Sequence, residues 1–400
     1  MPRVLYVSYW GALEQLGQSL VVPALKKLAQ MGADLTLITF EKPVDLARAD
    51  EMQRVRKMLA EDNIDWLPLK YHKDPKIPAT LFDMAHGIAR GIQKGLSKKF
   101  DIVHARTYPG GLIGLALAPL IGAKFVYHNE GFYPDEQVDG GVWAENSRPH
   151  RVAKRLENLM YSHADGIIAL SYRAQANIEK MPEVVRKKTP VIFVPSCVDL
   201  ERFLLPETKP DFLKDQLNLV YIGSVGNRYI LDKVGAFVAA ARKINPNVSL
   251  QIYSKADSEL ITKMLDDGGL AREAWKLEAV PYSEMPQHLS QYHAGLFFLT
   301  EGISEHGCSP TKIGEYWAVG LPVVTTPNVS DTDEIIKRER VGIIINEQTR
   351  ESYEQAYREM QELLDDSELS SRCRQAAESH YALAPACERQ FALYQKLIQK

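Results

Sequence analysis

Cysteine is scarce in this chain, and its few cysteines form no recognisable pattern. There is neither a C-x-x-C pair nor a Cys/His ligand spacing among the four of them, Cys197, Cys308, Cys373 and Cys387. A disulfide framework and a structural zinc site both depend on such spacings, so neither is indicated. We therefore expect the protein to work in a reducing cytosol.

Long hydrophobic runs are also missing. The longest apolar tract, residues 110–126, is interrupted by Pro119, Gly122 and Lys124 and falls short of the roughly 18 apolar residues that a bilayer span requires. The first residues show no basic segment followed by an apolar one, so we expect no secretory signal there. The expected location is cytoplasmic, and a peripheral position at the inner face of the membrane stays open.

The motifs of two common enzyme classes are absent. Without a G-x-G-x-x-G after a predicted strand, a nicotinamide-dependent dehydrogenase is disfavoured, and without a G-x-S-x-G elbow, so is a serine hydrolase. A D-x-D does occur at residues 331–333, but it opens a predicted helix, where Ser330 or Asp331 acts as the cap and acidic residues suit the helix dipole. We therefore predict no metal site and no cofactor.

The net charge of −3 conceals an uneven distribution. Residues 1–197 carry 26 Lys and Arg against 21 Asp and Glu, whereas residues 198–400 carry 22 against 30. Much of the positive charge in the first half lies at 94–99, 148–155 and 186–188. Such clusters suit anionic lipid surfaces, although solvated helix faces are the simpler explanation. No nucleic-acid partner is expected.

Short apolar runs alternate with helical patterns along the whole chain, which predicts parallel sheets. In the first half the predicted strands are 4–8, 35–40, 102–105, 124–128, 166–170 and 191–194, and the helices are 18–31, 83–98, 111–120 and 151–164. In the second half the predicted strands are 219–222, 249–253, 276–279, 295–299, 323–325 and 342–345, and the last helices are 352–364, 368–380 and 385–399.

The length of 400 residues suits two domains of about 200 residues each. Prolines at 195, 206 and 210 interrupt any regular element, so a boundary near residues 195–210 is predicted. The fold class is therefore α/β, with two Rossmann-like, doubly wound parallel-sheet domains. In such folds ligands bind at the carboxyl ends of the strands.

The most informative segment is Cys308-Ser-Pro-Thr-Lys-Ile-Gly-Glu-Tyr-Trp-Ala-Val-Gly-Leu-Pro322. Ser309 is the expected N-cap of a helix that starts at about Pro310, so the free amides of Thr311 and Lys312 point out of the positive end of the helix. Lys312 adds a full charge for a phosphate, and Glu315 can accept two hydrogen bonds from a ribose diol. An ordinary capped helix is the alternative explanation.

This segment resembles the donor-site motif of retaining family 4 (group 1) glycosyltransferases with the GT-B fold. Several other stretches are similar to one branch of the same family in register: 16–19 with 38–42, 105–109, 130–132 through 140–143, 194–199 and 221–229. The resemblance implies a GT-B fold in which the two domains face a central cleft. Residues 1–197 would form the acceptor-side domain, 198–380 the nucleotide-sugar domain, and 381–400 a helix that crosses back to the first domain.

One departure from the family pattern concerns the first of two acidic residues in E-x7-E. The position eight before Glu315 is Gly307, so the carboxylate that usually lies near the donor sugar is absent. Glu305 or Glu301 would have to replace it.

The turn at residues 223–226 follows a predicted strand and places small residues, including Ser224 and Gly226, where backbone amides can approach an anion. In family relatives a basic pair just past this turn holds the diphosphate. Here the candidates are Arg228 and Lys233, with a solvent-facing position as the alternative. Tyr282 lies in the loop that accommodates the nucleotide base in relatives.

The first half supplies candidates at the ends of its predicted strands. His128 corresponds to a histidine that contacts the donor sugar and phosphate in relatives, and a structural histidine is the alternative. Gly11 or Gly17 would allow backbone contact with donor or acceptor. The remaining candidates are acceptor-binding residues, and plain surface positions are the alternative for each: Arg106, Glu130, Asp135 and Glu136.

The sequence thus predicts a retaining, metal-independent glycosyltransferase that moves a sugar from a nucleoside diphosphate to a hydroxyl of a glycan, glycolipid or small molecule. His128, Lys312 and Glu315 are its expected catalytic residues, and UDP and GDP are the first nucleotides to consider. Two alternatives stay open: a GT-B epimerase or phosphorylase, and a catalytically silent nucleotide-sugar-binding protein.

Overall fold

The computed structural model describes residues 1–206, 216–282 and 284–399, and the chain divides into two compact units. The first unit comprises Met1–Pro134, Glu145–Cys197 and Leu383–Lys400, and the second comprises Asp135–Ala144 and Val198–Ala382. Residues 135–144 lie inside the range 1–197 of the first predicted domain but group with the second unit. Residues 207–210, the last part of the predicted boundary region 195–210, lie outside the described residues.

A parallel sheet forms the centre of the first unit, and its seven described strands have the order β3-β2-β1-β4-β5-β6-β7. They are β1 (Arg3–Ser8), β2 (Asp34–Glu41), β3 (Asp65–Lys70), β4 (Ile102–Arg106), β5 (Lys124–His128), β6 (Gly166–Ala169) and β7 (Val191–Phe193). The helices of this unit are α1 (Val22–Gln30), α2 (Pro43–Leu46), α3 (Ala49–Glu61), α4 (Lys76–Ser97), α5 (Tyr108–Leu120), α7 (Arg148–His163), α8 (Tyr172–Glu179), α9 (Pro182–Lys187) and α17 (Leu383–Ile398).

The second unit has the same plan, with six described parallel strands in the order β10-β9-β8-β11-β12-β13. They are β8 (Leu217–Ile222), β9 (Val248–Tyr253), β10 (Trp275–Glu278), β11 (Ala294–Phe297), β12 (Val323–Thr325) and β13 (Gly342–Ile344). Its helices are α10 (Leu231–Ile244), α11 (Ser258–Asp267), α12 (Met285–Leu289), α13 (Thr311–Ala318), α14 (Thr332–Glu339), α15 (Arg350–Leu364) and α16 (Leu369–Tyr381), and α6 (Tyr133–Asp139) joins it from Asp135 onward.

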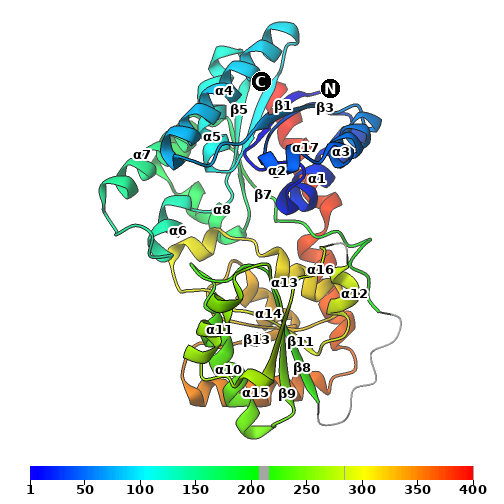
Figure 1. Ribbon diagram of the computed structural model, residues 1–400. Helices are drawn as coiled ribbons and strands as arrows, with labels where there is room; N and C mark the ends of the chain where they lie inside the picture. The colour runs from blue at the N-terminus through cyan, green and yellow to red at the C-terminus, as the bar shows by residue number, and fades with distance from the viewer. Residues whose placement is uncertain (207–215, 283, 400) are drawn as a thin grey trace. The chain divides into compact units, whose positions relative to one another are not determined.

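Each sheet is buried on both faces, which explains its nearly continuous apolar strands. In β1, for example, Val4 and Tyr6 pack into one core cluster with α1, α3 and α17, and Leu5 and Val7 pack into another with α5, α7 and α8. The second sheet likewise has one cluster on each face, with α13 and α16 on one side and α10 and α15 on the other. Helices therefore cover both faces of each sheet (Figure 1).

Strand β3 is absent from the sequence-based prediction, and its composition explains the miss. It contains Pro68, which cannot donate a ladder hydrogen bond and so disfavours a central strand. Among the described strands, β3 lies at the edge of the first sheet and pairs with β2. The predicted helix 18–31 is also modified, because a π-helical turn over Gly17–Val21 precedes α1.

Both sheets reverse their strand order at one place, and ligands of open α/β sheets bind at such switch points. In the first unit this place lies between β1 and β4, and in the second between β8 and β11. The loops that follow β8 and β11 carry the predicted residues Ser224, Gly226, Arg228 and Ser309, and α13, with Lys312 and Glu315, begins directly after the second of these loops. Among the described helices, none is long and apolar enough to cross a membrane.

Candidate active site

The side chain of Lys312 packs against the turn that follows β8. A Cβ atom built on Gly223 would lie 2.5 Å from Nζ and 2.2 Å from Cε of Lys312, so only glycine leaves room for the lysine. Gly223 also has a positive φ of 106°, a conformation that side-chain-bearing residues rarely adopt. The structure therefore brings together the first turn of α13 and the loop at the switch point of the second sheet.

The ammonium group of Lys312 is buried but has no hydrogen-bond acceptor among the described residues. Its nearest aromatic partner is Tyr229, whose ring centroid lies 4.0 Å from Nζ, and the ring of Phe297 lies 5.5 Å away. A cation–π contact stabilises the charge without using its N–H donors. The N–H donors of Lys312 therefore have no acceptor among the described residues.

The start of α13 differs by one residue from the prediction. The helix begins at Thr311, and Pro310 occupies the N-cap position with an extended ψ of 104° and no side-chain cap. Ser309 is therefore not the N-cap, because its neighbour Pro310 is not yet helical. The amides of Thr311 and Lys312 still belong to the first turn, whose N–H groups have no acceptor within the helix.

Glu315 lies one turn further along α13 and is almost fully buried, with 5% of its surface exposed. Its Oε1 accepts a 2.7 Å hydrogen bond from the hydroxyl of Tyr282. Burial raises the pKa of Glu315, while the bond from Tyr282 and the charge of Lys312 act in the opposite direction. The side chain of Tyr282 therefore contacts and positions Glu315, the residue predicted to bind the ribose.

The turn that contains Ser224 and Gly226 is held by hydrogen bonds to its backbone carbonyls, one from a side chain and one from the backbone. The hydroxyl of Tyr221 donates a 2.5 Å hydrogen bond to the carbonyl of Ser224, and the amide of Tyr229 donates a 3.0 Å bond to the carbonyl of Gly226. Gly226 and Asn227 both have positive φ. This tight geometry places the ring of Tyr229 over Lys312.

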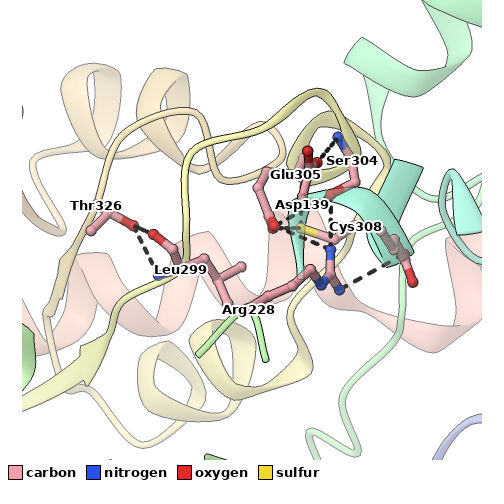
Figure 2. Close-up of polar contacts among 8 residues, drawn as sticks. Asp139, Arg228, Leu299, Ser304, Glu305, Cys308 and Thr326 are labelled. Atoms are coloured by element: carbon pink, nitrogen blue, oxygen red, sulfur yellow. Dashed lines mark hydrogen bonds and ion pairs between the residues drawn. The ribbon is translucent and has the colours of Figure 1, made fainter. Parts of the chain in front are cut away.

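Arg228 occupies an acidic environment in the structure, as Figure 2 shows. Its Nη1 lies 3.2 Å from Oε1 of Glu305 and donates a 3.4 Å hydrogen bond to the hydroxyl of Ser304, and its Nη2 lies 3.8 Å from Oε1 of Glu136. Two carboxylates thus contact Arg228, the residue predicted to bind a phosphate.

Glu305 is one of the two carboxylates considered as replacements for the one missing at Gly307. It lies on the 3₁₀ turn Ile303–Gly307 with its side chain fully buried, whereas Glu301 is exposed. Burial raises the pKa of Glu305 to about 7, although the charge of Arg228 acts against this rise. Glu305 therefore changes its charge near neutral pH.

The loop before Glu305 is fixed from two sides (Figure 2). The amide of Ser304 donates a 3.1 Å hydrogen bond to Oδ2 of Asp139, the last residue of α6. Thr326 exchanges two 3.0 Å hydrogen bonds with the backbone of Leu299, because its hydroxyl accepts from the amide and donates to the carbonyl.

Of the predicted acceptor residues, Asp135 and Glu136 lie in the first turn of α6 and hence in the second unit.

In the first unit the predicted residues His128, Arg106 and Glu130 lie together at the carboxyl ends of β4 and β5. Arg106 and Glu130 form a close ion pair, and Nε2 of His128 lies 3.4 Å from the same carboxylate oxygen, Oε1. The guanidinium of Arg106 also lies 5.4 Å from the centre of the Trp10 ring. These residues form one cluster, which we call the His128 cluster.

The His128 cluster is buried, since only 2% of His128 and 3% of Arg106 is exposed. Burial, together with the charge of Arg106, lowers the pKa of His128 well below 6.5, so the imidazole is neutral at pH 7. Burial raises the pKa of Glu130, and Arg106 opposes that rise. A ligand can reach Nε2 of His128 only after neighbouring side chains move.

The glycine-containing loop after β1 is held by a carboxylate that the sequence-based prediction did not single out. Glu41, at the end of β2, is buried and accepts hydrogen bonds from the amides of Ala12 at 2.7 Å and Leu13 at 3.3 Å. A Cβ atom on Gly17 would lie 1.9 Å from the carbonyl oxygen of Gly11. A Cβ atom on Gly11 would lie 2.5 Å from Oε2 of Glu41. Both glycines are therefore required by packing, and Glu41 fixes the loop in which Gly11 lies.

Two further features were not foreseen or proved weaker than expected. His104, in the middle of β4, forms a 3.1 Å hydrogen bond with His128, and an isolated histidine within a strand gives no sequence signal for this. Lys233 is 42% exposed and lies 3.4 Å from Asp232, consistent with the solvent-facing alternative.

At the D-x-D of residues 331–333, Asp331 is the N-cap residue of α14. Within residues 1–206, 216–282 and 284–399, there is no group of three or more His, Cys, Asp or Glu that could hold a metal.

The comparisons with known proteins cover both units. Residues 20–202 match the model for Glycosyltransferase Family 4, and residues 216–366 match the model for Glycosyl transferases group 1. No curated protein sequence matches the chain at a significant level.

Solved structures resemble the whole chain despite low sequence identity. Sucrose-phosphate synthase from Thermosynechococcus elongatus has a TM-score of 0.72 at 14% identity, with 100% of both chains covered. Anabaena HepE, solved in complex with UDP, has a TM-score of 0.68 at 12% identity, covering 99% of this chain and 100% of its own. A mutant of TarM from S. aureus, solved with UDP, has a TM-score of 0.67 at 10% identity, covering 98% and 100%.

The two parallel-sheet units agree with the two matching family models and with the fold of the solved structures. The chain belongs to the family 4 (group 1) glycosyltransferases with the GT-B fold.

Proposed function

We propose that this glycosyltransferase uses a nucleoside diphosphate sugar, retains the configuration of the anomeric carbon and needs no metal ion. The observation that supports this best is the buried ammonium of Lys312, whose donors have no acceptor among the described residues. It lies on the first turn of α13, where helix amides also attract an anion. Together these groups can take up the charge of a departing diphosphate.

The transfer breaks the bond between the anomeric carbon and the diphosphate oxygen and forms a bond from that carbon to the acceptor hydroxyl oxygen. In the retaining route implied by the family, the acceptor attacks the face from which the diphosphate leaves. The acceptor proton then passes to the leaving phosphate oxygen. Lys312 and the amides of α13 would stabilise the developing charge, since each charge-assisted hydrogen bond is worth about 1.5–3 kcal/mol.

UDP is the nucleotide that we propose first. Solved structures with this fold include complexes of HepE with UDP and with UDP-glucose, and of TarM with UDP. Glu315 would hold the ribose, with Tyr282 fixing its orientation through the 2.7 Å hydrogen bond. The acceptor class, whether glycan, glycolipid or small molecule, is proposed only as a carrier of a free hydroxyl.

The test is a thermal-shift screen of UDP, GDP and their sugars, followed by product analysis with and without acceptor. A nucleotide at 100 times its Kd raises the free energy of unfolding by about 2.7 kcal/mol. Transfer products with the donor's anomeric configuration, formed equally well in EDTA, are expected. An inverted product, a requirement for divalent metal, or epimerisation without acceptor would each contradict part of the proposal.

We further propose that the first unit touches anionic lipid through the start of α4 rather than through the three basic clusters. Several lysines of those clusters are paired with carboxylates, among them Lys94 with Asp65 at 2.6 Å and Lys154 with Glu157 at 2.6 Å. By contrast, three large apolar side chains are exposed at the start of α4: Ile77 at 72%, Leu81 at 59% and Phe82 at 58%.

The segment 70–82 also carries three exposed lysines at 70, 73 and 76 against one acid at 74. Exposed apolar side chains beside lysines suit the interface of an anionic membrane. Co-sedimentation with anionic vesicles should exceed that with neutral vesicles, and Phe82→Glu should abolish the difference. Leu260→Glu, at an exposed position on α11, is the matched control. Equal sedimentation of Phe82→Glu and the wild type would contradict this contact.

A further inference from the structure

A chain of hydrogen bonds connects the C-terminal helix α17 to His128. Nε2 of Gln390 donates a 2.7 Å hydrogen bond to the hydroxyl oxygen of Tyr394. That hydroxyl lies 2.6 Å from Nδ1 of His104, and Nε2 of His104 lies 3.1 Å from Nδ1 of His128. All four residues belong to the first unit.

Each of these groups is sealed from solvent, so the protein itself has to satisfy them. His104 and Tyr394 are 0% exposed, and Gln390 and His128 are 2% exposed. The ring of His104 is also stacked on Tyr6, with centroids 4.3 Å apart and planes inclined by 16°. Its rotation is therefore blocked, and each of its nitrogens faces one partner.

The direction of the protons follows from the first donor in the chain. Because Gln390 donates to the oxygen of Tyr394, the single hydroxyl proton of Tyr394 is directed to Nδ1 of His104. Burial keeps both histidines neutral, so one nitrogen of each ring accepts while the other donates. His104 then carries its proton on Nε2 and donates it to Nδ1 of His128.

We propose that Gln390 and Tyr394 are positioning residues that fix His128 as the tautomer with its proton on Nε2. This nitrogen lies 3.4 Å from Oε1 of Glu130, which is long for a hydrogen bond, so its proton can be donated to an oxygen of the sugar donor once neighbouring side chains move. The inference deepens the proposed function and rests on it for the role of His128 in transfer. The hydrogen-bond chain itself is independent of any activity.

The first experiment measures the tautomer directly by ¹⁵N NMR of the full-length protein with labelled histidine. The chain has ten histidines, and the resonances of His128 are identified by their loss in His128→Gln. In the wild type, Nε2 should have the shift of a protonated ring nitrogen and Nδ1 that of an unprotonated one. A proton on Nδ1 of His128 would overturn the inference.

The second experiment breaks the chain with Tyr394→Phe, which removes one oxygen atom and keeps the ring. Without the hydroxyl, both tautomers of His104 become accessible, and the two ¹⁵N shifts of His128 should move toward each other. Unchanged shifts would overturn the inference. The matched control is Tyr357→Phe, because the hydroxyl of Tyr357 is buried with no hydrogen-bond partner among the described residues.

Kinetics then separates a positioning role from a merely structural one. Tyr394→Phe should lower kcat by about tenfold and change KM for the nucleotide sugar by less than about twofold, because a misdirected proton weakens a contact in the transition state. Equal kcat values with an altered tautomer would overturn the role in transfer. If the wild type transfers no sugar, the proposed function fails, and the spectra still decide whether the chain sets the tautomer.

Discussion

Arg228 and Glu305 form a 3.2 Å ion pair in which the side chain of Glu305 is fully buried and that of Arg228 is 18% exposed. The pair joins two loops that follow neighbouring strands at the switch point of the second sheet, one after β8 and one after β11. Its charge near neutral pH depends on Glu305, because burial raises the pKa of that carboxyl to about 7. The pair thus makes stability in this region sensitive to pH.

We predict that Glu305 makes the protein less stable as the pH rises from about 4.5 to 7. In this window the folded protein keeps the proton of Glu305 while the unfolded chain, with a usual glutamate pKa of 4.5, has lost it. The free energy of unfolding therefore falls with rising pH, by up to about 3 kcal/mol for this group. Urea unfolding of the wild type and Glu305→Gln between pH 5 and 8 measures the difference.

Glu305→Gln should gain stability relative to the wild type as the pH rises from 5 to 8, since glutamine does not titrate. Glu301→Gln, which changes an exposed carboxylate on the same loop, should follow the wild-type profile. A constant difference between Glu305→Gln and the wild type at all pH values would show that Glu305 keeps an ordinary titration.

Lys312→Ala should weaken both UDP binding and catalysis. The substitution removes a buried ammonium that has no acceptor among the described residues and that we propose binds the phosphate, so kcat/KM should fall by about 10- to 100-fold. Isothermal titration with UDP and initial rates with the confirmed donor measure the two effects. Lys263→Ala, at an exposed position on α11, is the control. Unchanged kcat/KM in Lys312→Ala would remove Lys312 from the phosphate site.

Gly223→Ala should abolish most activity, because its new methyl group would occupy the place of the Lys312 side chain. The Cβ atom would lie 2.2 Å from Cε of Lys312, so the lysine has to leave its position. Gly269→Ala is a matched control, since Gly269 also has a positive φ but a Cβ there meets nothing within 4 Å. Both variants should lose about 1–2 kcal/mol of stability from the backbone conformation. Only Gly223→Ala should lose more than about tenfold in kcat/KM.

Glu315→Gln should reduce the preference for a nucleotide with an intact ribose diol. A carboxylate accepts hydrogen bonds at both oxygens, and among the described residues Tyr282 bonds only to Oε1, so Oε2 can accept from the diol. We expect the wild type to bind UDP about tenfold more tightly than its 2′,3′-dideoxy analogue. The ratio of the two Kd values should approach one in Glu315→Gln. A ratio that is close to one already in the wild type would place the ribose elsewhere.

The fold was predictable from the sequence to a large extent. Short apolar runs revealed twelve of the thirteen described sheet strands, because a strand buried on both faces has to be apolar throughout. The exception, β3, contains Pro68 and lies at an edge, where the run is neither fully apolar nor fully paired. The helix at Lys312 and Glu315 was also found from sequence, since its flanking prolines and glycine are local signals.

The partners of the candidate residues were not predictable. The sequence placed His128 and Arg106 at strand ends, but it gave no indication that Tyr394 and Gln390, more than 250 positions later, complete the same network. Likewise, it offered Arg228 as a phosphate ligand without revealing that Glu305 and Glu136 already hold it.

The sequence by itself therefore determined the two parallel sheets, the family and the helix that bears Lys312, since these depend on local pattern and spacing. Only the tertiary structure decided which charges are paired, which partners the nitrogens of His104 and His128 face, and that the ammonium of Lys312 has no acceptor among the described residues. The physical reason is that burial and hydrogen-bond direction depend on residues distant in the chain, and these meet only when the sheets and helices pack.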